Sequence, residues 1–473
     1  MEINSEIFRL YDIRGIFPRE INEETSYQIG RCFIHFLRKE KGDKKFQIAV
    51  GRDIRLSSPL LFKSFSNGVR DEGCDIIDLG LITTPMLYFA VSNFNYDGGV
   101  IITASHNPNP FNGLKLTREK AIPLAGNTGI FWMKDFLLKK QFSSQEKAVS
   151  REEIYEKDIN EDYLRLNLKM ADIKEDEFKD FSLVIDAGNG TGGPIAVELL
   201  KRTGIKIYPL YCQPDGSFPN HVPDPLLQKN LADVISLVKE KNADFGIALD
   251  GDADRIFFID ENGIPVSGDL ITALMAKILL RELPFDPKNP FKILYDIRSS
   301  NIVGESIERG IGIPYCIGHS LIKEKMRKDD ILFGGELSGH YYLGQGLFYE
   351  VPFFVLLKIL KELKKEKTVF SNLIKPYKKY YHSGEINFEI KNKEEKIKEL
   401  KELYGNGKIL EIDGLRVDYD DWWFLARMSN TEPVLRLTIE AKTKENFLKR
   451  KQELIKVINA PILNEPLIYK TLS

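Results

Sequence analysis

The sequence predicts an α/β protein built from several domains, and three observations support this prediction. A chain of 473 residues is too long for one hydrophobic core, so three or four domains are expected. Runs typical of strands alternate with runs typical of helices over most of the chain, as they do in α/β layers. Hydrophobic residues make up 43% of the chain and charged residues 29%, which is typical of a soluble globular protein.

The first segment, to about residue 150, shows this alternation clearly. Its predicted elements are strands over Phe46–Val50, Asp75–Leu79 and Gly99–Ile102, and a helix over Pro59–Val69. The charged stretch Lys139–Glu156, rich in Lys, Gln, Ser and Glu, is interpreted as a linker.

Two more segments follow with the same alternation of predicted strands and helices. The second is predicted to contain a strand over Ser182–Asp186, a helix over Pro194–Thr203 and a strand over Asp244–Leu249. The third begins near Gly268 with a long helix. It continues with strands over Lys292–Tyr295 and Ile331–Phe333 and a helix over Phe353–Lys364.

Lysine-rich sequence around Lys375–Lys379 marks the start of a different, C-terminal segment. Its predicted elements are a strand over Glu385–Glu389, a helix over Lys393–Leu403, and strands around Leu410–Val417, Trp422–Ala426 and Leu435–Glu440. The helix carries Ile397, Leu400 and Leu403 on one face and charged residues elsewhere, so it is expected to lie on a sheet.

Composition excludes several classes of function. The net charge of −2 gives no general affinity for polyanions, so nucleic acid is not an expected partner. The most apolar run, Val351–Leu357, ends at Lys358 and is too short to span a membrane, and the acidic N-terminus does not resemble a signal peptide. The four cysteines are scattered without a disulfide pattern, which suits a reducing compartment. A cytoplasmic enzyme is the resulting expectation.

The loop Thr103–Pro108 is the first candidate for chemistry. It follows a strand typical of a buried core and places the Ser105 hydroxyl beside the His106 imidazole and the Asn107 amide. The structural alternative is a turn in which Ser and Asn bond their own backbone.

The loop Asp250–Arg255 carries the most specific signal. Asp250, Asp252 and Asp254 alternate directly after an apolar strand, and three carboxylates cannot lie together in a low dielectric without a cation. Hard oxygen ligands suit Mg²⁺ or Ca²⁺. The structural alternative is a solvated acidic turn.

A calcium-binding EF-hand is the competing explanation for these acids, and Glu261 falls at its twelfth position. Its sixth position requires Gly but is Arg255 here, and both flanks are typical of strands rather than helices. The EF-hand is therefore excluded.

Two further polar stretches suit a sugar phosphate. Arg427–Pro433 collects a guanidinium, hydroxyls and an amide, donors that suit a phosphate dianion, although a polar turn ended by Pro433 is the alternative. In an extended Gly335–His340 segment, Glu336, Ser338 and His340 would point to one side and fit vicinal sugar hydroxyls.

Two weaker patterns have structural explanations. Gly188–Gly193 matches GxGxxG between a strand and a helix, but the next strand, Ile205–Tyr211, has no acid at its tip. Tight strand-to-helix packing explains these glycines better than a dinucleotide site. Near the N-terminus, Arg14 and Arg55 each stand close to an Asp, and such charge pairs ordinarily fix a loop; Arg14 and Lys115 are also candidates to face a phosphate.

Together, the Thr103–Pro108, Asp250–Arg255, Gly335–His340 and Arg427–Pro433 motifs resemble the α-D-phosphohexomutase family, in particular its phosphomannomutase/phosphoglucomutase branch. The resemblance covers essentially the whole chain. It implies three similar mixed α/β domains and a smaller C-terminal α+β domain, similar to the TATA-binding protein, around a central cleft. The expected boundaries are 1–152 for the phosphoserine domain, 153–262 for the metal-binding domain, 263–373 for the sugar-binding domain and 374–473 for the C-terminal phosphate-binding domain.

The resemblance also implies roles for individual residues. Ser105 would be the phosphorylated residue and would hold one Mg²⁺ together with Asp250, Asp252 and Asp254. The residues expected around the transferring phosphate are His106, Lys115, Arg14 and Arg255, with Lys115 and His340 as candidate acid/base groups. The residues expected to bind substrate are Tyr11, Arg298, His319, Glu336, Ser338, His340, Arg427, Ser429, Asn430 and Thr431.

The implied reaction interconverts hexose 1-phosphate and hexose 6-phosphate, with a hexose 1,6-bisphosphate as intermediate and activator. Asn430 favours mannose and glucose phosphates, because phosphoglucosamine mutases usually carry Gly there. Arg298 stands where many relatives carry Lys, and the stretch before Glu350 lacks their Asp-Asp-Gly. Phosphoglucosamine mutase, a catalytically silent sugar-phosphate sensor and a Mg²⁺ phosphatase remain alternatives. The expected partners are small sugar phosphates, with no nucleic acid or membrane, and the expected state is a monomer or homodimer.

Overall fold

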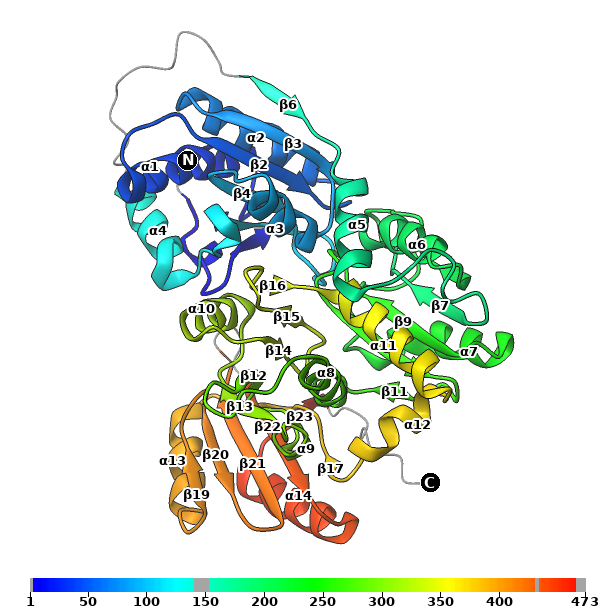
Figure 1. Ribbon diagram of the computed structural model, residues 1–473. Coiled ribbons are helices and arrows are strands. Elements are labelled where there is room, and N and C mark those ends of the chain that lie inside the picture. The colour runs from blue at the N-terminus through cyan, green and yellow to red at the C-terminus, as the bar shows by residue number, and fades with distance from the viewer. Residues whose placement is uncertain (1–2, 140–152, 430–433, 465–473) are drawn as a thin grey trace. The chain divides into compact units, whose positions relative to one another are not determined.

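The computed structural model describes residues 3–139, 153–429 and 434–464, which form two compact units (Figure 1). The first unit contains the described residues of Met1–Ile264, Gly318–Asp330 and His340–Lys367. The second unit contains those of Pro265–Ile317, Ile331–Gly339 and Thr368–Ser473. Each unit is therefore assembled from segments that are not consecutive in the sequence.

The N-terminal part of the first unit is built on a mixed sheet. In spatial order its strands are β1 (Ile13–Ile16), β5 (Phe111–Arg118), β4 (Gly98–Ile102), β2 (Gln47–Arg52), β3 (Asp75–Leu81) and β6 (Ile154–Glu156). The strands β4, β2, β3 and β6 run parallel, whereas β5 is antiparallel to both β1 and β4. The loop between β4 and β5 therefore lies at the carboxyl ends of the parallel strands β4 and β2, where α/β proteins commonly bind ligands.

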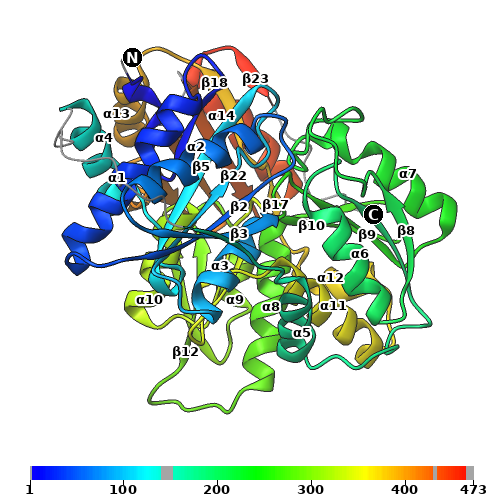
Figure 2. The ribbon, with the colours of Figure 1, turned by 90° about the horizontal axis from the view of Figure 1, so that it is seen from above.

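Helices cover both faces of this sheet (Figure 2). They are α1 (Glu23–Lys41), α2 (Ser58–Asp71), α3 (Thr84–Asn93) and α4 (Phe131–Leu138). Gly98 lies against Phe33 of α1, while its neighbour Gly99 lies against Leu87 and Val91 of α3. Because successive strand residues point to opposite faces, α1 and α3 pack on opposite sides of β4.

A second sheet in the same unit has the spatial order β10 (Ile256–Asp260), β9 (Phe245–Leu249), β7 (Ser182–Asp186) and β8 (Lys206–Leu210). The helices α5 (Asn160–Ala171), α6 (Gly192–Arg202) and α7 (Ala232–Lys241) accompany it. Strand β10 pairs antiparallel with β9, with Ile256 opposite Leu249, so Asp250–Arg255 forms the turn of this hairpin.

Two α-helices and two strands from later in the chain also belong to the first unit. They are α10 (His319–Asp329), β15 (Tyr341–Leu343), β16 (Tyr349–Glu350) and α11 (Pro352–Glu366). Strands β15 and β16 pair antiparallel. Lys361 of α11 donates to the carbonyl of Asp172, just after α5, at 2.7 Å, which ties this part to the segment that carries the second sheet.

The second unit contains a parallel three-stranded arrangement. Its strands are β13 (Gly310–Tyr315), β12 (Phe291–Asp296) and β14 (Phe333–Gly335), with β12 in the middle. The short strand β11 (Pro265–Val266) and the helices α8 (Gly268–Glu282), α9 (Asn301–Glu305) and α12 (Phe370–Ile374) also belong to this unit.

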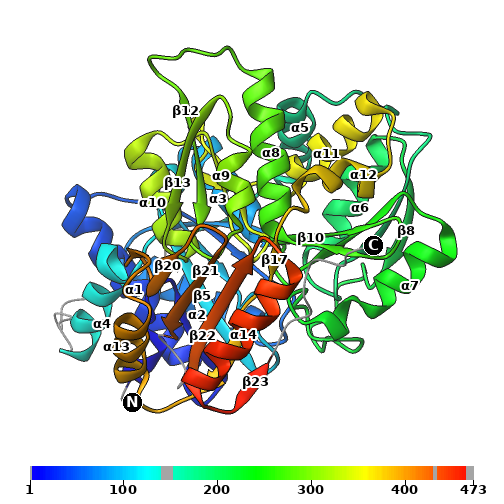
Figure 3. The same cartoon turned by 90° about the horizontal axis from the view of Figure 1, so that it is seen from below.

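The C-terminal part of the second unit is an antiparallel sheet with two helices on it (Figure 3). Its spatial order is β19 (Lys408–Leu410), β20 (Leu415–Asp418), β21 (Trp422–Met428), β22 (Val434–Ala441), β18 (Ile386–Glu389) and β23 (Ile462–Asn464), and β17 (Tyr381–His382) also pairs with β22. Leu400 of α13 (Lys393–Leu403) and Phe447 and Leu454 of α14 (Lys444–Ile458) are buried in one core with the sheet.

The α/β fold class predicted from the sequence is confirmed, with four differences in detail. Residues 154–156, interpreted as linker, form β6, and residues 140–152 lie outside the described part. The strand expected around Leu410–Val417 is two strands, β19 and β20, joined by a turn. The strand expected over Ile331–Phe333 instead runs over Phe333–Gly335 as β14. Leu403 is mostly exposed rather than packed beside Leu400. Within the described residues, the helices lack the length and apolar composition needed to cross a membrane.

Candidate active site

Ser105 sits in the loop between β4 and β5 with an unusual backbone. Its φ angle of 50° lies in the left-handed region, which few non-glycine residues adopt. The backbone N–H of Ser105 donates to Oγ1 of Thr103 at 2.9 Å and so closes a turn, although the acceptor is Thr103 and not the Ser or Asn side chain of the structural alternative. The turn and the candidate nucleophile therefore coexist in the same loop.

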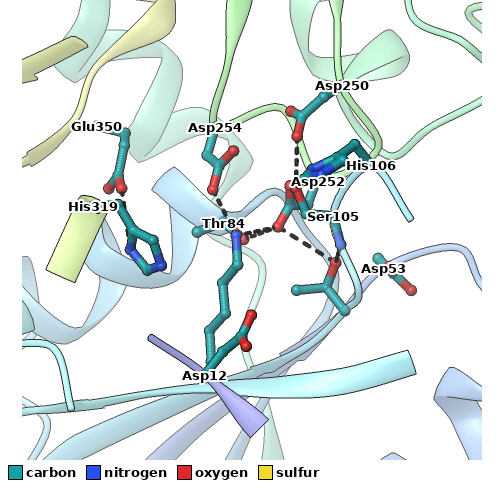
Figure 4. Close-up of polar contacts among 12 residues, drawn as sticks. Asp12, Asp53, Thr84, Ser105, His106, Asp250, Asp252, Asp254, His319 and Glu350 are labelled. Atoms are coloured by element: carbon teal, nitrogen blue, oxygen red, sulfur yellow. Dashed lines mark hydrogen bonds and ion pairs between the residues drawn. The ribbon is translucent and has the colours of Figure 1, made fainter. Parts of the chain in front are cut away.

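The three aspartates of the β9–β10 turn converge as predicted (Figure 4). One carboxylate oxygen from each of Asp250, Asp252 and Asp254 lies within 4.8 Å of the others, and all three side chains are buried. The Ser105 hydroxyl donates to Oδ2 of Asp250 at 2.7 Å. The serine loop and the acidic loop, 145 residues apart in sequence, therefore form one site.

Glycines allow these loops to approach each other closely. A Cβ atom at Gly251 would lie 2.5 Å from the Ser105 carbonyl oxygen, and one at Gly190 would lie 2.7 Å from the Gly251 carbonyl oxygen. The N–H of Thr191 donates to that Gly251 carbonyl at 2.9 Å. The Gly188–Gly193 motif thus packs against the acidic turn, which supports the structural explanation of its glycines.

The acidic cluster fits a divalent cation. Its donors are hard carboxylate oxygens beside a hydroxyl, and Oδ1 of Asp252 is buried without a hydrogen-bond partner among the described residues. On another side, the Lys115 ammonium lies 2.7 Å from Asp252 Oδ2 and 2.6 Å from Asp254 Oδ2. Thr84 Oγ1 also donates to Asp252 Oδ2, at 2.6 Å. The cluster could therefore hold a metal ion with Lys115 as a neighbouring cation.

Proximity and burial shift the pKa values of these acids in opposite directions. Burial, helped by the charges of Asp254 and Asp252, raises the pKa of Asp250 well above its ordinary value. Burial also acts on Asp254, but the Lys115 ammonium and the neighbouring His340 ring outweigh it and hold the pKa of Asp254 well below its ordinary value. Asp250 and Asp254 are therefore not equivalent, and the charge of Asp250, the partner of Ser105, requires a cation more than that of Asp254 does.

Two predicted residues lie on the serine loop. His106 Nδ1 is 3.2 Å from Ser105 Oγ, and burial together with the Arg255 and Arg14 cations lowers the pKa of His106 well below its ordinary value. The imidazole is therefore neutral near pH 7. Arg14 donates from Nη1 to the Asn107 side-chain oxygen and pairs with Asp12, so the predicted Arg–Asp pair is present and reaches this loop.

Arg255 and two histidines lie on another side of the acidic cluster. Arg255 Nε is 3.3 Å from His340 Nε2, which in turn lies 3.3 Å from Asp254 Oδ1. The His319 ring is 6.3 Å from the His340 ring and 6.0 Å from the Tyr11 ring, measured between centroids. All of these residues were predicted as site residues, and they form a continuous row.

Glu350 forms a buried ion pair that the sequence did not reveal. Its two carboxylate oxygens lie 2.9 Å and 3.0 Å from Lys323 Nζ on α10. His319 Nδ1 is 3.8 Å from Glu350 Oε1 (Figure 4). Burial and the Lys323 and Lys115 cations lower the pKa of His319 well below its ordinary value. Glu350 thus lies near the predicted sugar-binding histidine, although the family's Asp-Asp-Gly is absent.

Arg298 belongs to the second unit, where it is held by two carboxylates. Its Nη2 is 2.7 Å from Asp296 Oδ2, and its Nη1 donates to Glu385 Oε2 at 2.9 Å. Asp296 Oδ2 also accepts from the N–H of Leu337 at 2.8 Å, and Glu336 Oε1 is 3.9 Å from Arg298 Nη2. Arg298 and Glu336, both predicted to bind substrate, are therefore neighbours.

The expected extended conformation of Gly335–His340 is wrong. Strand β14 ends at Gly335, and the N–H of Gly339 donates back to the Glu336 carbonyl at 3.0 Å, which makes a turn. Gly339 has a φ of 83°, which permits this turn. Glu336 and Ser338 belong to the second unit and His340 to the first, so alternation along a strand does not place the three side chains together.

The predicted phosphate loop begins with an arginine in an ion-pair network. Arg427 Nε donates to Glu385 Oε1 at 2.9 Å, and its Nη1 lies 3.9 Å from Asp413 Oδ2. The carbonyl of Ser429 accepts from Lys393 Nζ at 2.9 Å. Asn430 and Thr431 lie outside the described residues.

Glu385 is not identified from the sequence, because its role depends on contacts with residues that are distant in the sequence. It connects Arg298 and Arg427, two predicted binding residues that are far apart in sequence. Although burial opposes this, those two cations hold the pKa of Glu385 well below its ordinary value. Only an isolated acid at the start of a predicted strand marks it in the sequence.

Fold and site together define an α/β protein in which a loop serine faces a buried acidic cluster suited to a divalent metal. Four domain profiles described as Phosphoglucomutase/phosphomannomutase match the chain: alpha/beta/alpha domain I over residues 5–131, domain II over 157–263, domain III over 267–380 and the C-terminal domain over 385–457. The chain belongs to the phosphoglucomutase/phosphomannomutase family, and its fold comprises three α/β domains and a C-terminal domain.

Individual relatives agree with this assignment. A phosphomannomutase of Methanocaldococcus jannaschii is 38% identical over 96% of this chain and 98% of its own length. A phosphomannomutase/phosphoglucomutase of Pseudomonas aeruginosa is 35% identical over 94% of this chain and 93% of its own. A crystal structure of a phosphoglucomutase/phosphomannomutase family protein from Burkholderia thailandensis superimposes with a TM-score of 0.85 at 29% identity, covering 98% of this chain and 100% of that one.

We expect Asp252→Asn to weaken divalent-cation binding by about tenfold or more, because it removes one of three clustered charges that would bind the ion. Binding of Mn²⁺, followed by electron paramagnetic resonance, measures this. Asp233→Asn, which changes an exposed aspartate on α7, is the matched control and should bind Mn²⁺ as the unaltered chain does. Equal affinity in all three proteins would place the cation elsewhere.

We expect Glu385 to make the stability of the protein depend on pH. Its folded pKa is below the value of about 4.3 for an unfolded glutamate, so its stabilising effect is complete above about pH 5 and decreases as the pH falls toward the folded value. The difference in free energy of unfolding between the unaltered chain and Glu385→Gln should therefore shrink from pH 7 to pH 4.

Urea denaturation across this pH range measures that difference. Glu389→Gln changes an exposed carboxylate on the same strand, β18, and should leave the free energy of unfolding nearly unchanged. A difference for Glu385→Gln that stays constant with pH would contradict the expectation.

Proposed function

We propose that this chain is a phosphohexomutase that interconverts hexose 1-phosphates and hexose 6-phosphates of mannose, glucose or both, through a phosphorylated serine. The observation that carries the proposal is the Ser105 hydroxyl, 2.7 Å from Asp250 within the acidic cluster. Relatives similar over nearly their whole length are named phosphomannomutase or phosphomannomutase/phosphoglucomutase, which supports the same activity.

In the proposed reaction, phosphorylated Ser105 donates its phosphoryl group to the free C1 or C6 hydroxyl of a hexose monophosphate. The bond between phosphorus and Ser105 Oγ breaks as the bond to the sugar oxygen forms, and the sugar hydroxyl gives its proton to a base. The resulting hexose 1,6-bisphosphate returns its other phosphoryl group to Ser105 by the reverse chemistry. Such a transfer needs mainly positioning and charge neutralisation.

The first unit would supply these needs. His106 and Arg14 lie on or against the serine loop and would donate hydrogen bonds to the phosphate on Ser105. Lys115 and Arg255, at the acidic cluster, would balance its charge. Lys115 and His340 are the proposed acid/base groups, because both contact Asp254 at the edge of the cluster, and whichever of them takes the sugar proton must do so in its neutral form.

One Mg²⁺ per chain is the proposed metal, held by Asp250, Asp252, Asp254 and the Ser105 phosphate. When bound, it would withdraw charge from the phosphate ester and so make phosphoserine a better phosphoryl donor. Hexose 1,6-bisphosphate is the proposed activator, because it can phosphorylate Ser105 in a chain that has lost its phosphate.

The remaining predicted residues would bind the sugar phosphate. We propose that Glu336, Ser338, Arg298, Tyr11 and His319 contribute sugar contacts. The proposed contacts for the phosphate that is not transferred are Arg427, Ser429, Asn430 and Thr431. These roles assign phosphoserine, metal, sugar and phosphate functions to residues 1–152, 153–262, 263–373 and 374–473, respectively.

We expect the chain, with Mg²⁺ and a trace of glucose 1,6-bisphosphate, to convert mannose 1-phosphate, glucose 1-phosphate or both into the 6-phosphates. ³¹P NMR distinguishes substrate, product and free phosphate in one experiment. Stoichiometric release of free phosphate would indicate a phosphatase, and turnover of glucosamine phosphate alone would indicate a phosphoglucosamine mutase. Binding without turnover would indicate a sensor.

We expect radiolabelled phosphate from the bisphosphate to remain on the protein and to be lost in Ser105→Ala, because the variant has no hydroxyl to phosphorylate. Ser217→Ala, which removes an exposed hydroxyl in the loop after β8, should retain the label. Autoradiography of the denatured proteins gives the result. Label that persists in Ser105→Ala would refute the proposed phosphoserine.

A further inference from the structure

Arg55 is a buried cation with no role in the mechanism above. It lies between β2 and α2, and only 1% of its surface is exposed. Its Nη2 donates to the Ser105 carbonyl at 2.7 Å and to the Asn107 carbonyl, and its Nη1 donates to the Phe111 carbonyl at 3.0 Å. One guanidinium therefore holds carbonyls along the serine loop up to the start of β5.

The guanidinium is itself fixed on other sides. Nε of Arg55 lies 3.1 Å from Asp53 Oδ2, and Asp53 Oδ1 accepts from the Arg55 N–H at 3.0 Å and from Ser58 Oγ at 2.6 Å. The ring of Phe218, in the loop after β8, lies 5.1 Å from the guanidinium carbon. These contacts hold the Arg55 guanidinium in one orientation, with its donors directed to several acceptors.

The contacts of Arg55 coincide with the strained part of the loop. Ser105 has its φ at 50°, and its carbonyl oxygen, besides accepting from Arg55, faces Gly251 so closely that a Cβ there would lie 2.5 Å away. A backbone in this region persists only where its surroundings hold it. The direction of the Ser105 hydroxyl toward Asp250 depends on this backbone shape.

We propose that Arg55 is a positioning residue that holds the Ser105 loop in its reactive shape. The inference rests on the proposed function, since it concerns the efficiency of phosphoryl transfer at Ser105. Within the serine loop, the described hydrogen bonds of Arg55 go to backbone carbonyls, so it acts through the position of Oγ and not on the transferring phosphate. Its loss should therefore lower kcat and leave KM for the sugar phosphate nearly unchanged.

The charge of the Arg55 guanidinium and its number of hydrogen-bond donors indicate which substitutions are informative. Arg55→Lys keeps the charge but offers a single ammonium, which cannot donate to the Ser105, Asn107 and Phe111 carbonyls while pairing with Asp53. Arg55→Met removes charge and donors together. Asp53→Asn keeps the guanidinium but weakens its anchor, so it should act in the same direction with a smaller effect.

Arg52→Met is the matched control. Arg52 is three residues away, pairs with Asp78 at 2.8 Å and stacks on Phe62, and it has no contact with the serine loop among its described interactions. This variant loses a partly buried ion pair but should keep the serine loop intact. Thermal unfolding of every variant sets a common assay temperature at which all are folded.

The experiment measures kcat and KM for the sugar phosphate, the rate of Ser105 phosphorylation by glucose 1,6-bisphosphate, and the ³¹P chemical shift of phosphoserine in the full chain. For Arg55→Lys and Arg55→Met we expect kcat and the phosphorylation rate to fall about 10- to 100-fold, with KM within about twofold and a displaced ³¹P shift. Asp53→Asn should show a smaller decrease, and Arg52→Met none.

The outcomes separate this inference from the proposed function. An unaltered chain that neither turns over sugar phosphate nor acquires phosphate on Ser105 would refute the proposed function. An unaltered chain that does both, with Arg55→Lys and Asp53→Asn matching Arg52→Met in kcat and ³¹P shift, would overturn the role of Arg55. Variants that are less stable yet keep kcat when folded would also overturn it, because Arg55 would then only stabilise the fold.

Discussion

The first unit depends on one electrostatic constraint: three carboxylates lie within 4.8 Å of one another in a buried loop. Such a cluster is stable only with cations beside it, because burial and mutual repulsion both disfavour the charged forms. Strand β5 brings Lys115 against Asp252 and Asp254, and β4 leads into the loop that brings Ser105 to Asp250. The N-terminal sheet therefore supplies both the internal cation and the candidate nucleophile to a loop of the second sheet.

In the second unit the charges are reversed: buried cations are stabilised by carboxylates beside them. Arg298 and Arg427 are buried cations, and Glu385 lies between them with one oxygen directed to each. Asp296 pairs with Nη2 of Arg298 and also accepts a hydrogen bond from the backbone N–H of Leu337, next to Glu336. Arg298 and Arg427, which the sequence suggests as ligand contacts, are thus held in place by carboxylates. Less ordering of these side chains is then required when a ligand binds.

The sequence predicts best where a motif is local. Asp250, Asp252 and Asp254 converge because they lie in the short turn of a two-stranded hairpin. The apolar runs on either side of this turn predict the strands β9 and β10 from the sequence. The extended conformation expected for Gly335–His340 is wrong, because Gly339 turns the chain where alternation suggests a strand. Arg55, Glu385 and Lys323 depend on partners between 27 and 87 residues away, and no local pattern indicates such partners.

The paired charges also limit which ligands can bind. A cation entering the acidic cluster meets the Lys115 ammonium, and an anion approaching Arg427 must compete with Glu385 for Nε. A phosphate dianion can compete, because it carries more charge than a carboxylate and accepts from several donors at once, whereas a neutral sugar cannot. The chain's own ion pairs therefore favour ligands with concentrated charge, such as divalent metals and phosphate esters. That preference is what the transfer of a phosphoryl group between two positions of one sugar demands, since the same sites must hold a phosphate before and after every step.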